Sequence, residues 1–198
     1  MKVRITFTEP LLGTQPANKE LHTDYIASKA PDAMTRTEEI EAMGAEEVES
    51  KAMTIFPRTE DDIPFLWDYQ WKGFFKESCS MLHKIKYGES GKMTAFKKLI
   101  DGTIFVYPRK IPVIFDGNIR DNQRPLRAST PQGERIAIAH SEEIPAGATC
   151  ELEIECLCKD HEKAVREWLD YGAKHGTGQW RNASYGRFEW AEITEATV

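Results

Sequence analysis

The residues best suited to do chemistry gather near the C-terminus, in the stretch GAKHGTGQWRNASYGRFEW (172–190). Glycines there alternate with cationic and aromatic side chains, the candidates being Gly176, Gly178, Trp180, Arg181, Gly186 and Arg187. Glycine lets a backbone take positive φ and come close to another chain, and arginine forks match phosphate or carboxylate oxygens. The pattern indicates either a loop that grips an anionic partner or a plain connection between a helix and a strand. Alternation predicts that Phe188 and Trp190 are buried. The glycines at both ends predict an exposed loop over 176–186 that presents Trp180 and Arg181.

A second group of cationic residues lies in the middle of the chain, in FDGNIRDNQRPLRASTPQGER. It contributes three further candidate binding residues, Arg120, Arg124 and Arg127, downstream of Arg109 and Lys110. These arginines either bind phosphate or carboxylate groups or pair with acidic neighbours in the same stretch. If the last strands lie side by side, this cluster and the glycine-rich loop share one face.

The four cysteines include a C-x-C-x-x-H arrangement ending at His161, which raises the question of a metal site. Alternation across CELEIEC instead places Cys150, Cys156 and Cys158 on the same face as leucine and isoleucine. Zinc sites favour a C-x2-C pair with a matching second pair, and the chain has none. We therefore expect buried cysteines, no metal and no cofactor.

The elements that position these residues follow from hydrophobic periodicity. KVRITF (2–7) alternates as a strand, 18–30 and 72–85 have helical spacing, and a hairpin is expected around PQG. A long strand (148–158), a helix (161–174) and a last strand (186–193) close the chain. Strand, helix, glycine loop and strand form half of a split βαβ unit. We predict a single α+β domain over 1–198, with a ferredoxin-like sheet, the N-terminal strand and helix as its other half, and 31–102 as a largely helical elaboration.

GTGQWRNASYGRF (176–188) resembles the glycine-rich loop of the repeat-associated (RAMP) CRISPR proteins, which lies between the last helix and last strand of a ferredoxin-like fold. The resemblance implies that Gly176, Gly178 and Gly186 allow close approach to an RNA backbone and that Arg181 and Arg187 meet its phosphates.

The whole chain also resembles a family of uncharacterised phage and prophage proteins. The likeness lies in stretches such as KVRITFTEPLLGT, FPRTEDDIPFLWDYQWKGFFKES and NQRPLRASTPQGERIAIAHSEEIPAG. It implies a viral accessory protein that acts in a bacterial cytoplasm.

Known catalytic signatures are absent: the chain has no G-x-S-x-G, no H-E-x-x-H, no Walker loop and no G-x-G-x-x-G after a strand. Its five histidines are dispersed. A metal-free RAMP ribonuclease needs a base near the scissile 2′-hydroxyl, and only His22 has a position that would match. We expect binding rather than catalysis.

Charge is unevenly distributed along the 198 residues. Residues 1–62 carry a net charge of −6, residues 63–139 carry +6, and residues 140–198 carry −6. This distribution argues against a general duplex-DNA binder and leaves room for a local anionic ligand or a charged interface. No apolar run is long enough to cross a membrane.

Two functions are compatible with these observations. The first is a non-enzymatic anti-defence protein that inhibits or decoys a host defence protein or ribonucleoprotein complex. The second is a RAMP-like protein that binds or processes RNA or a nucleotide. A virion component is a third possibility.

Overall fold

The computed structural model describes residues 1–17, 53–130 and 133–193. It divides into two compact units. The first comprises the described parts of Met1–Leu11, Pro57–Asn118 and Ile144–Val198, and the second those of Leu12–Phe56 and Ile119–Glu143. Within each unit the chain makes its own sheet, and the two are described in turn.

The first unit is built on a four-stranded sheet in the order β11-β1-β10-β6. Its strands are β1 (Lys2–Phe7), β6 (Ile104–Tyr107), β10 (Thr149–Cys156) and β11 (Phe188–Glu192). Every neighbouring pair is antiparallel. Along the chain the order is β1-α4-β6-β10-α6-β11, with helices α4 (Asp68–Lys84) and α6 (His161–His175) as the crossovers. This is the ferredoxin-like arrangement of two interlocked split βαβ units.

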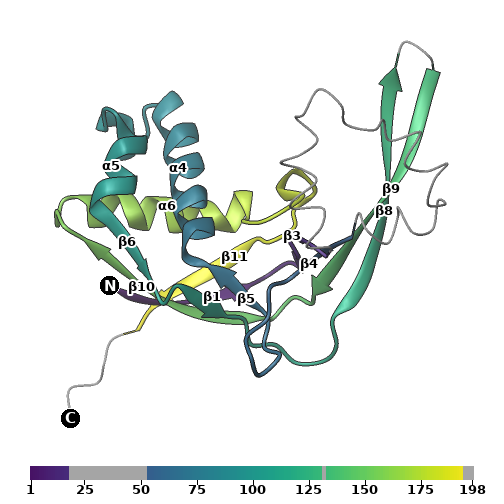
Figure 1. Ribbon diagram of the computed structural model, residues 1–198. Helices are drawn as coiled ribbons and strands as arrows, with labels where there is room; N and C mark the ends of the chain where they lie inside the picture. The colour runs from purple at the N-terminus through teal and green to yellow at the C-terminus, as the bar shows by residue number, and fades with distance from the viewer. Residues whose placement is uncertain (18–52, 131–132, 194–198) are drawn as a thin grey trace, which may run out of the picture. The chain divides into compact units, whose positions relative to one another are not determined.

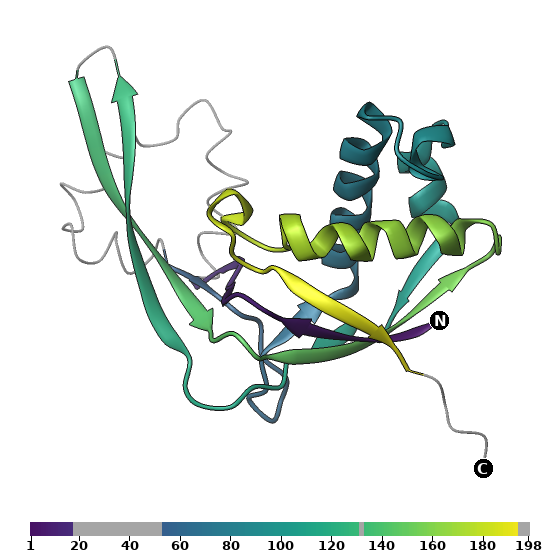
Figure 2. The same cartoon turned by 180° about the vertical axis from the view of Figure 1, so that it is seen from behind.

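The strands form where apolar and polar residues alternate. Val3, Ile5 and Phe7 are buried on β1, and Cys150, Leu152 and Ile154 are buried on β10, with exposed residues between them. Both helices lie over the same face of the sheet (Figures 1 and 2). The alternating apolar residues therefore face the helices and form the core with them.

The helices bury aromatic side chains against this sheet. On α6, the residues at i, i+1, i+4, i+5 and i+8 are buried, as the sequence predicts: Ala164, Val165, Trp168, Leu169 and Gly172. On α4, Trp71 and Phe74 make edge-on contacts with the ring of Phe188, and Phe75 packs against Trp168. Asp160 takes the N-cap position of α6 as expected, but its side chain makes no capping hydrogen bond.

Shorter elements complete the first unit. η1 (Ser90–Lys92) and α5 (Phe96–Thr103) follow α4, and α5 leads directly into β6. β5 (Phe65–Trp67) pairs with β7 (Lys110–Pro112) as a small antiparallel sheet at the start of α4, with Trp67 opposite Lys110. Near the C-terminus, η2 (Arg181–Ala183) lies within the glycine-rich loop.

The second unit is centred on the hairpin that the sequence predicts around PQG. Strands β8 (Arg120–Thr130) and β9 (Gly133–Ile144) pair without a break from Arg120↔Glu143 to Thr130↔Gly133. β4 (Thr54–Ile55) joins β9 in parallel, and β3 (Gln15–Pro16) joins β4. β2 (Leu11–Leu12) pairs with the other side of this sheet at β9.

The first crossover helix differs from the expected one. We assigned this role to the helix predicted at 18–30, which lies outside the described residues. In the structure the crossover is α4, which falls inside the segment 31–102 that we interpreted as an elaboration. Its Phe74 and Phe75 supply apolar surface to the core, and this burial gives α4 its place on the sheet.

Candidate functional site

The glycine-rich loop leaves α6 at Gly176 and returns to the sheet at β11. Its two ends are joined by a hydrogen bond from the Thr177 amide to the Gly186 carbonyl, at 2.9 Å. Both Gly176 and Gly186 have positive φ, of 77° and 69°. A side chain at either position would run into backbone across the neck of the loop, Tyr185 in one case and Thr177 in the other. These two glycines therefore allow the loop to approach itself, and the role in RNA approach that the resemblance implies stays a prediction.

The loop borders an open hollow of about 560 Å³. Its walls come from α4, the end of α6 and η2, through the side chains of Glu77, His175, Trp180, Arg181, Asn182 and Ala183. A guanidinium, an amide and an indole meet there, beside the Glu77 carboxylate and the His175 imidazole. Guanidinium binds phosphate, amide reads base edges and indole stacks on bases.

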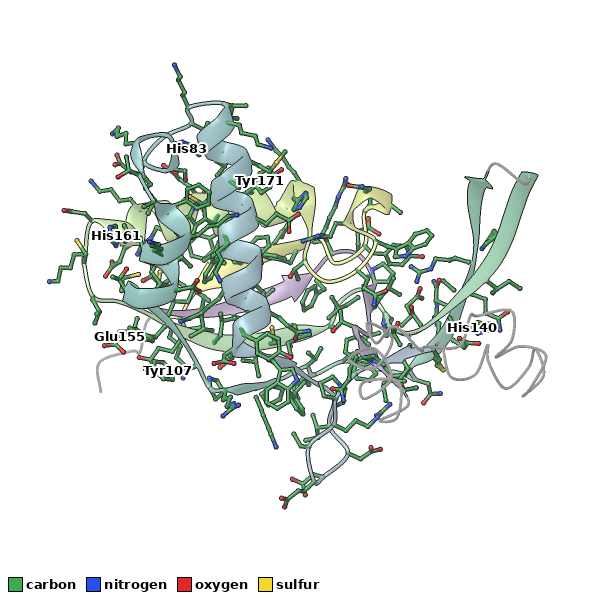
Figure 3. The ribbon with its side chains drawn as sticks, turned by 45° about the horizontal axis from the view of Figure 1, so that its top comes forward. His83, Tyr107, His140, Glu155, His161 and Tyr171 are labelled. Carbon is green, nitrogen blue, oxygen red and sulfur yellow. The ribbon has the colours of Figure 1, made fainter. Side chains whose placement is uncertain are left out.

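Glu77 of α4 contacts two other side chains of this site. One carboxylate oxygen lies 3.1 Å from Nε2 of His175, and the other accepts a hydrogen bond from Nη1 of Arg181. The side chains of Glu77 and Arg181 are 34% and 31% exposed, so solvent and a ligand can reach the pair. The ring of Tyr171 stacks on His175 at 5.1 Å, and Figure 3 shows Tyr171 on α6. The carboxylate therefore fixes Arg181 at the mouth of the hollow.

The aromatic residues of this stretch do not all lie where alternation places them. Phe188 is fully buried as predicted. Trp190 is only half-buried, which corrects the prediction of a core position, and its Nε1 donates to Oδ1 of Asp170 at 2.8 Å. β11 ends the sheet order, so Trp190 borders solvent on that side. Trp180 and Arg181 are half-buried, which corrects the prediction that both are exposed, and Trp180 has a positive φ of 57°.

The remaining cationic candidates of the first unit differ in exposure. Arg187 is half-buried at the start of β11, and its carbonyl accepts the amides of Thr8 and Glu9. Arg109 and Lys110 are exposed where the chain enters β7.

The arginine cluster lies on β8 in the second unit. Arg120 is exposed. Arg124 is only 8% exposed, and its Nη2 donates to Oγ of Ser141 at 2.9 Å, so it takes part in the packing of the hairpin. Arg127 is one of the paired residues of β8. The cluster and the glycine-rich loop belong to different units, and their sharing of one face stays a prediction.

Two of the four cysteines are buried as expected, and the other two are only half-buried. Cys79 and Cys150 are buried, Cys156 and Cys158 are half-buried, and all four are free thiols. Burial raises the pKa of Cys79 and of Cys156 to about 11, and raises that of Cys150 further. Among the described residues no group of three or more histidine, cysteine or acidic side chains could hold a metal ion.

The other histidines have separate surroundings. Nδ1 of His83 lies 3.1 Å from the Ser90 carbonyl, and His140 lies 3.5 Å from Asp121 on the hairpin. Figure 3 labels His83 and His161 at different places on the helical layer. His22, the candidate base, lies outside the described residues. Within the part of the chain that the structure describes, only His175 lines the hollow.

Trp180 and Arg181 are candidates from the sequence, which gave no sign of Glu77 and His175 beside them. Glu77 is 104 positions away from Arg181, and His175 ends the preceding helix. Neither has a distinctive local pattern. The one available signal is that His175 immediately precedes the first glycine of the loop.

Comparison with known proteins supports the fold. No protein-family model matches the chain, and no curated protein sequence matches it. A chain in the cryo-EM structure of the Type III-B Cmr-beta bound to cognate target RNA superposes with a TM-score of 0.55 at 12% sequence identity. The match covers 98% of this protein and 58% of that chain, so the protein spans less than two thirds of its length. The likeness shows a shared fold, which in this protein is the ferredoxin-like arrangement of the first unit.

No helix in the described part of the chain is long and apolar enough to cross a membrane.

Proposed function

We propose that this protein binds RNA through the glycine-rich loop, as a RAMP-like component of a CRISPR ribonucleoprotein complex. The observation that carries the proposal is the composition of the hollow at the loop, where Arg181, Asn182 and Trp180 meet. A guanidinium beside an indole provides one group for the phosphate and one for the base of a nucleotide. The shared fold with a chain of an RNA-bound Cmr structure supports the same conclusion.

Glu77 makes the site responsive to a ligand. In the free protein its carboxylate compensates the charge of Arg181. An RNA phosphate that enters the hollow competes with this carboxylate for the guanidinium, which is partly exposed and can turn toward it. The Glu77–Arg181 ion pair is thus a contact of the free protein that a ligand replaces. An ion pair of this kind at a surface contributes at most about 1 kcal/mol to stability.

The test is the RNA affinity of Arg181→Gln, measured by fluorescence anisotropy over a range of salt concentrations. We expect weaker binding and a salt dependence reduced by about one phosphate contact. Arg166→Gln is the matched control, because Arg166 also pairs with carboxylates and is 37% exposed, but lies away from the hollow. Unchanged affinity in Arg181→Gln, or an equal loss in both variants, would contradict the proposal.

A second candidate function is inhibition of a defence complex by taking the place of one of its subunits. It is favoured by the coverage of the structural match, in which nearly all of this protein corresponds to part of a longer chain, together with the resemblance to phage and prophage proteins. The tagged protein would then recover a type III ribonucleoprotein from host lysate and lower its target-RNA cleavage. A complex that is recovered with full activity would support the first function over the second.

A further inference from the structure

An aromatic stack lies at the start of α4, outside the glycine-rich loop. The rings of Trp67 and Tyr69 are stacked, with centroids 5.9 Å apart and planes inclined by 17°. The ring of Phe65 meets that of Trp67 edge-on, with centroids 4.8 Å apart. Phe65 is buried, so it supports the stack from the protein interior. Tyr69 is 60% exposed. One ring face of Tyr69 is thus covered by Trp67, and the other is accessible to a ligand.

Two cations belong to the same surface. The guanidinium of Arg109 lies 5.7 Å from the ring centroid of Trp67, and Nζ of Lys110 lies 5.5 Å from that of Phe65. Pairing of β5 with β7 sets Lys110 opposite Trp67, and the Asp68 amide donates to the Arg109 carbonyl at 3.0 Å. Backbone hydrogen bonds therefore fix cations and rings in one cluster. Among the described residues, neither Arg109 nor Lys110 forms an ion pair with a carboxylate.

The acidic groups near this cluster are few, and the nearest in sequence is hydrogen-bonded to the backbone. Asp68 is the nearest in sequence, and its Oδ1 accepts the amide of Tyr69 at 2.8 Å. The acidic turn at 60–62 precedes the end of β5 that lies opposite to Trp67. Burial and the Asp68 carboxylate raise the pKa of Tyr69, whereas the two cations lie at the rings of Trp67 and Phe65.

We propose that Trp67, Tyr69, Arg109 and Lys110 form a stacking platform for unpaired bases of single-stranded RNA. A base lies on the exposed face of Tyr69 and extends the Trp67–Tyr69 stack, while the cations contact the flanking phosphates. This inference rests on the proposed function and adds to it a second contact and a class of substrate. Single strands fit because their bases can leave the helix to stack, whereas those of a duplex are already stacked. A proline-rich peptide would use the rings and would gain little from the cations.

The experiment measures the affinity of the full chain for a short oligouridine by fluorescence anisotropy. Tyr69→Ala is expected to weaken binding about five-fold or more, which is the effect of losing one stacked base. Tyr69→Phe keeps the ring and is expected to bind within about two-fold of the unaltered protein. Tyr87→Ala is the matched control, because Tyr87 is also an exposed tyrosine, at 55%, but lies beyond the far end of α4. Tyr69 is mostly exposed, so these variants are expected to fold, and circular dichroism verifies it.

A titration with inorganic polyphosphate and the variant Arg181→Gln distinguish failure of the platform from failure of the proposed function. Polyphosphate has no bases, so a platform for bases predicts that Tyr69→Ala leaves its affinity unchanged. Loss of oligouridine binding in Arg181→Gln but not in Tyr69→Ala would overturn the platform and leave the proposed function standing. Loss in Tyr69→Ala but not in Arg181→Gln would support the platform and overturn the role of the loop. No oligouridine binding by the unaltered protein would overturn both.

Discussion

Gly172 on α6 lies directly against the ring of Phe188 on β11. A methyl group at Gly172 would overlap that ring, which Trp71 and Phe74 also enclose, with centroids 5.5 and 5.4 Å away. The absence of a side chain at this one helical position is what lets α6 come close to the sheet. The strand that follows the candidate RNA-binding loop is anchored by this contact.

Gly172→Ala is therefore expected to destabilise the protein by about 1–3 kcal/mol, as overpacking of a core does. Gly73→Ala is the matched control, since Gly73 is exposed within α4 and has open space around it. That change is expected to stabilise by about 0.5–1 kcal/mol, because alanine favours helix more than glycine does. Urea denaturation measures both, and shifts of the same sign would contradict the packing described for Gly172.

A buried hydrogen-bond network links η1 to α6. Nε1 of Trp168 donates to Oγ of Ser90 at 2.9 Å, and this hydroxyl donates to Oε2 of Glu167 at 2.7 Å. Ser90→Ala would leave the indole N–H without an acceptor and is expected to cost about 1–3 kcal/mol. Ser80→Ala, on the half-exposed side of α4, is expected to change stability by less than about 0.5 kcal/mol. Thermal unfolding compares the two, and equal melting temperatures would argue against the network.

Local periodicity was enough to predict β1, β10 and α6, and the PQG turn was enough to predict the β8–β9 hairpin. In β1, β10 and α6 apolar residues repeat at the period of the element, and the buried residues follow that period. The resemblance of one loop to RAMP proteins also led to the correct fold class. These features depend on residues close together in sequence.

Features that depend on distant residues were not predicted. Nothing near Glu77 signals that its carboxylate meets Arg181, because the pairing exists only once α4 and α6 share a face of the sheet. Trp190 has the correct alternation for burial, but its exposure depends on which strand ends the sheet order. Arg124 appeared to be a surface cation, and its burial follows from pairing within the hairpin.

Thiol reactivity should follow the raised pKa values. Burial, with a smaller effect of the Glu167 carboxylate, raises the pKa of Cys79 to about 11. The folded state thus holds this proton more tightly than the unfolded chain, whose thiols titrate near pH 8.5. The contribution to stability is complete below that pH and is lost as the pH rises toward 11. Alkylation followed by mass spectrometry should label Cys79 slowly at pH 8 in the folded protein and rapidly in urea. Equal rates in the two states would contradict its burial.

Glu77→Gln tests the candidate site by strengthening it. The change removes a negative charge next to Arg181 and keeps a side chain that can hydrogen-bond to His175. If phosphate enters the hollow, the freed guanidinium should bind RNA several-fold more tightly at low salt, and the gain should shrink as salt screens the charges. Glu151→Gln is the control, since Glu151 also pairs with an arginine, Arg4, but on β10, away from the loop. Anisotropy titrations at two salt concentrations measure the gain in RNA affinity and its decrease with salt. Weaker RNA binding by Glu77→Gln would show that the carboxylate serves to position Arg181 for the ligand, whereas unchanged binding would mean that RNA does not reach the hollow.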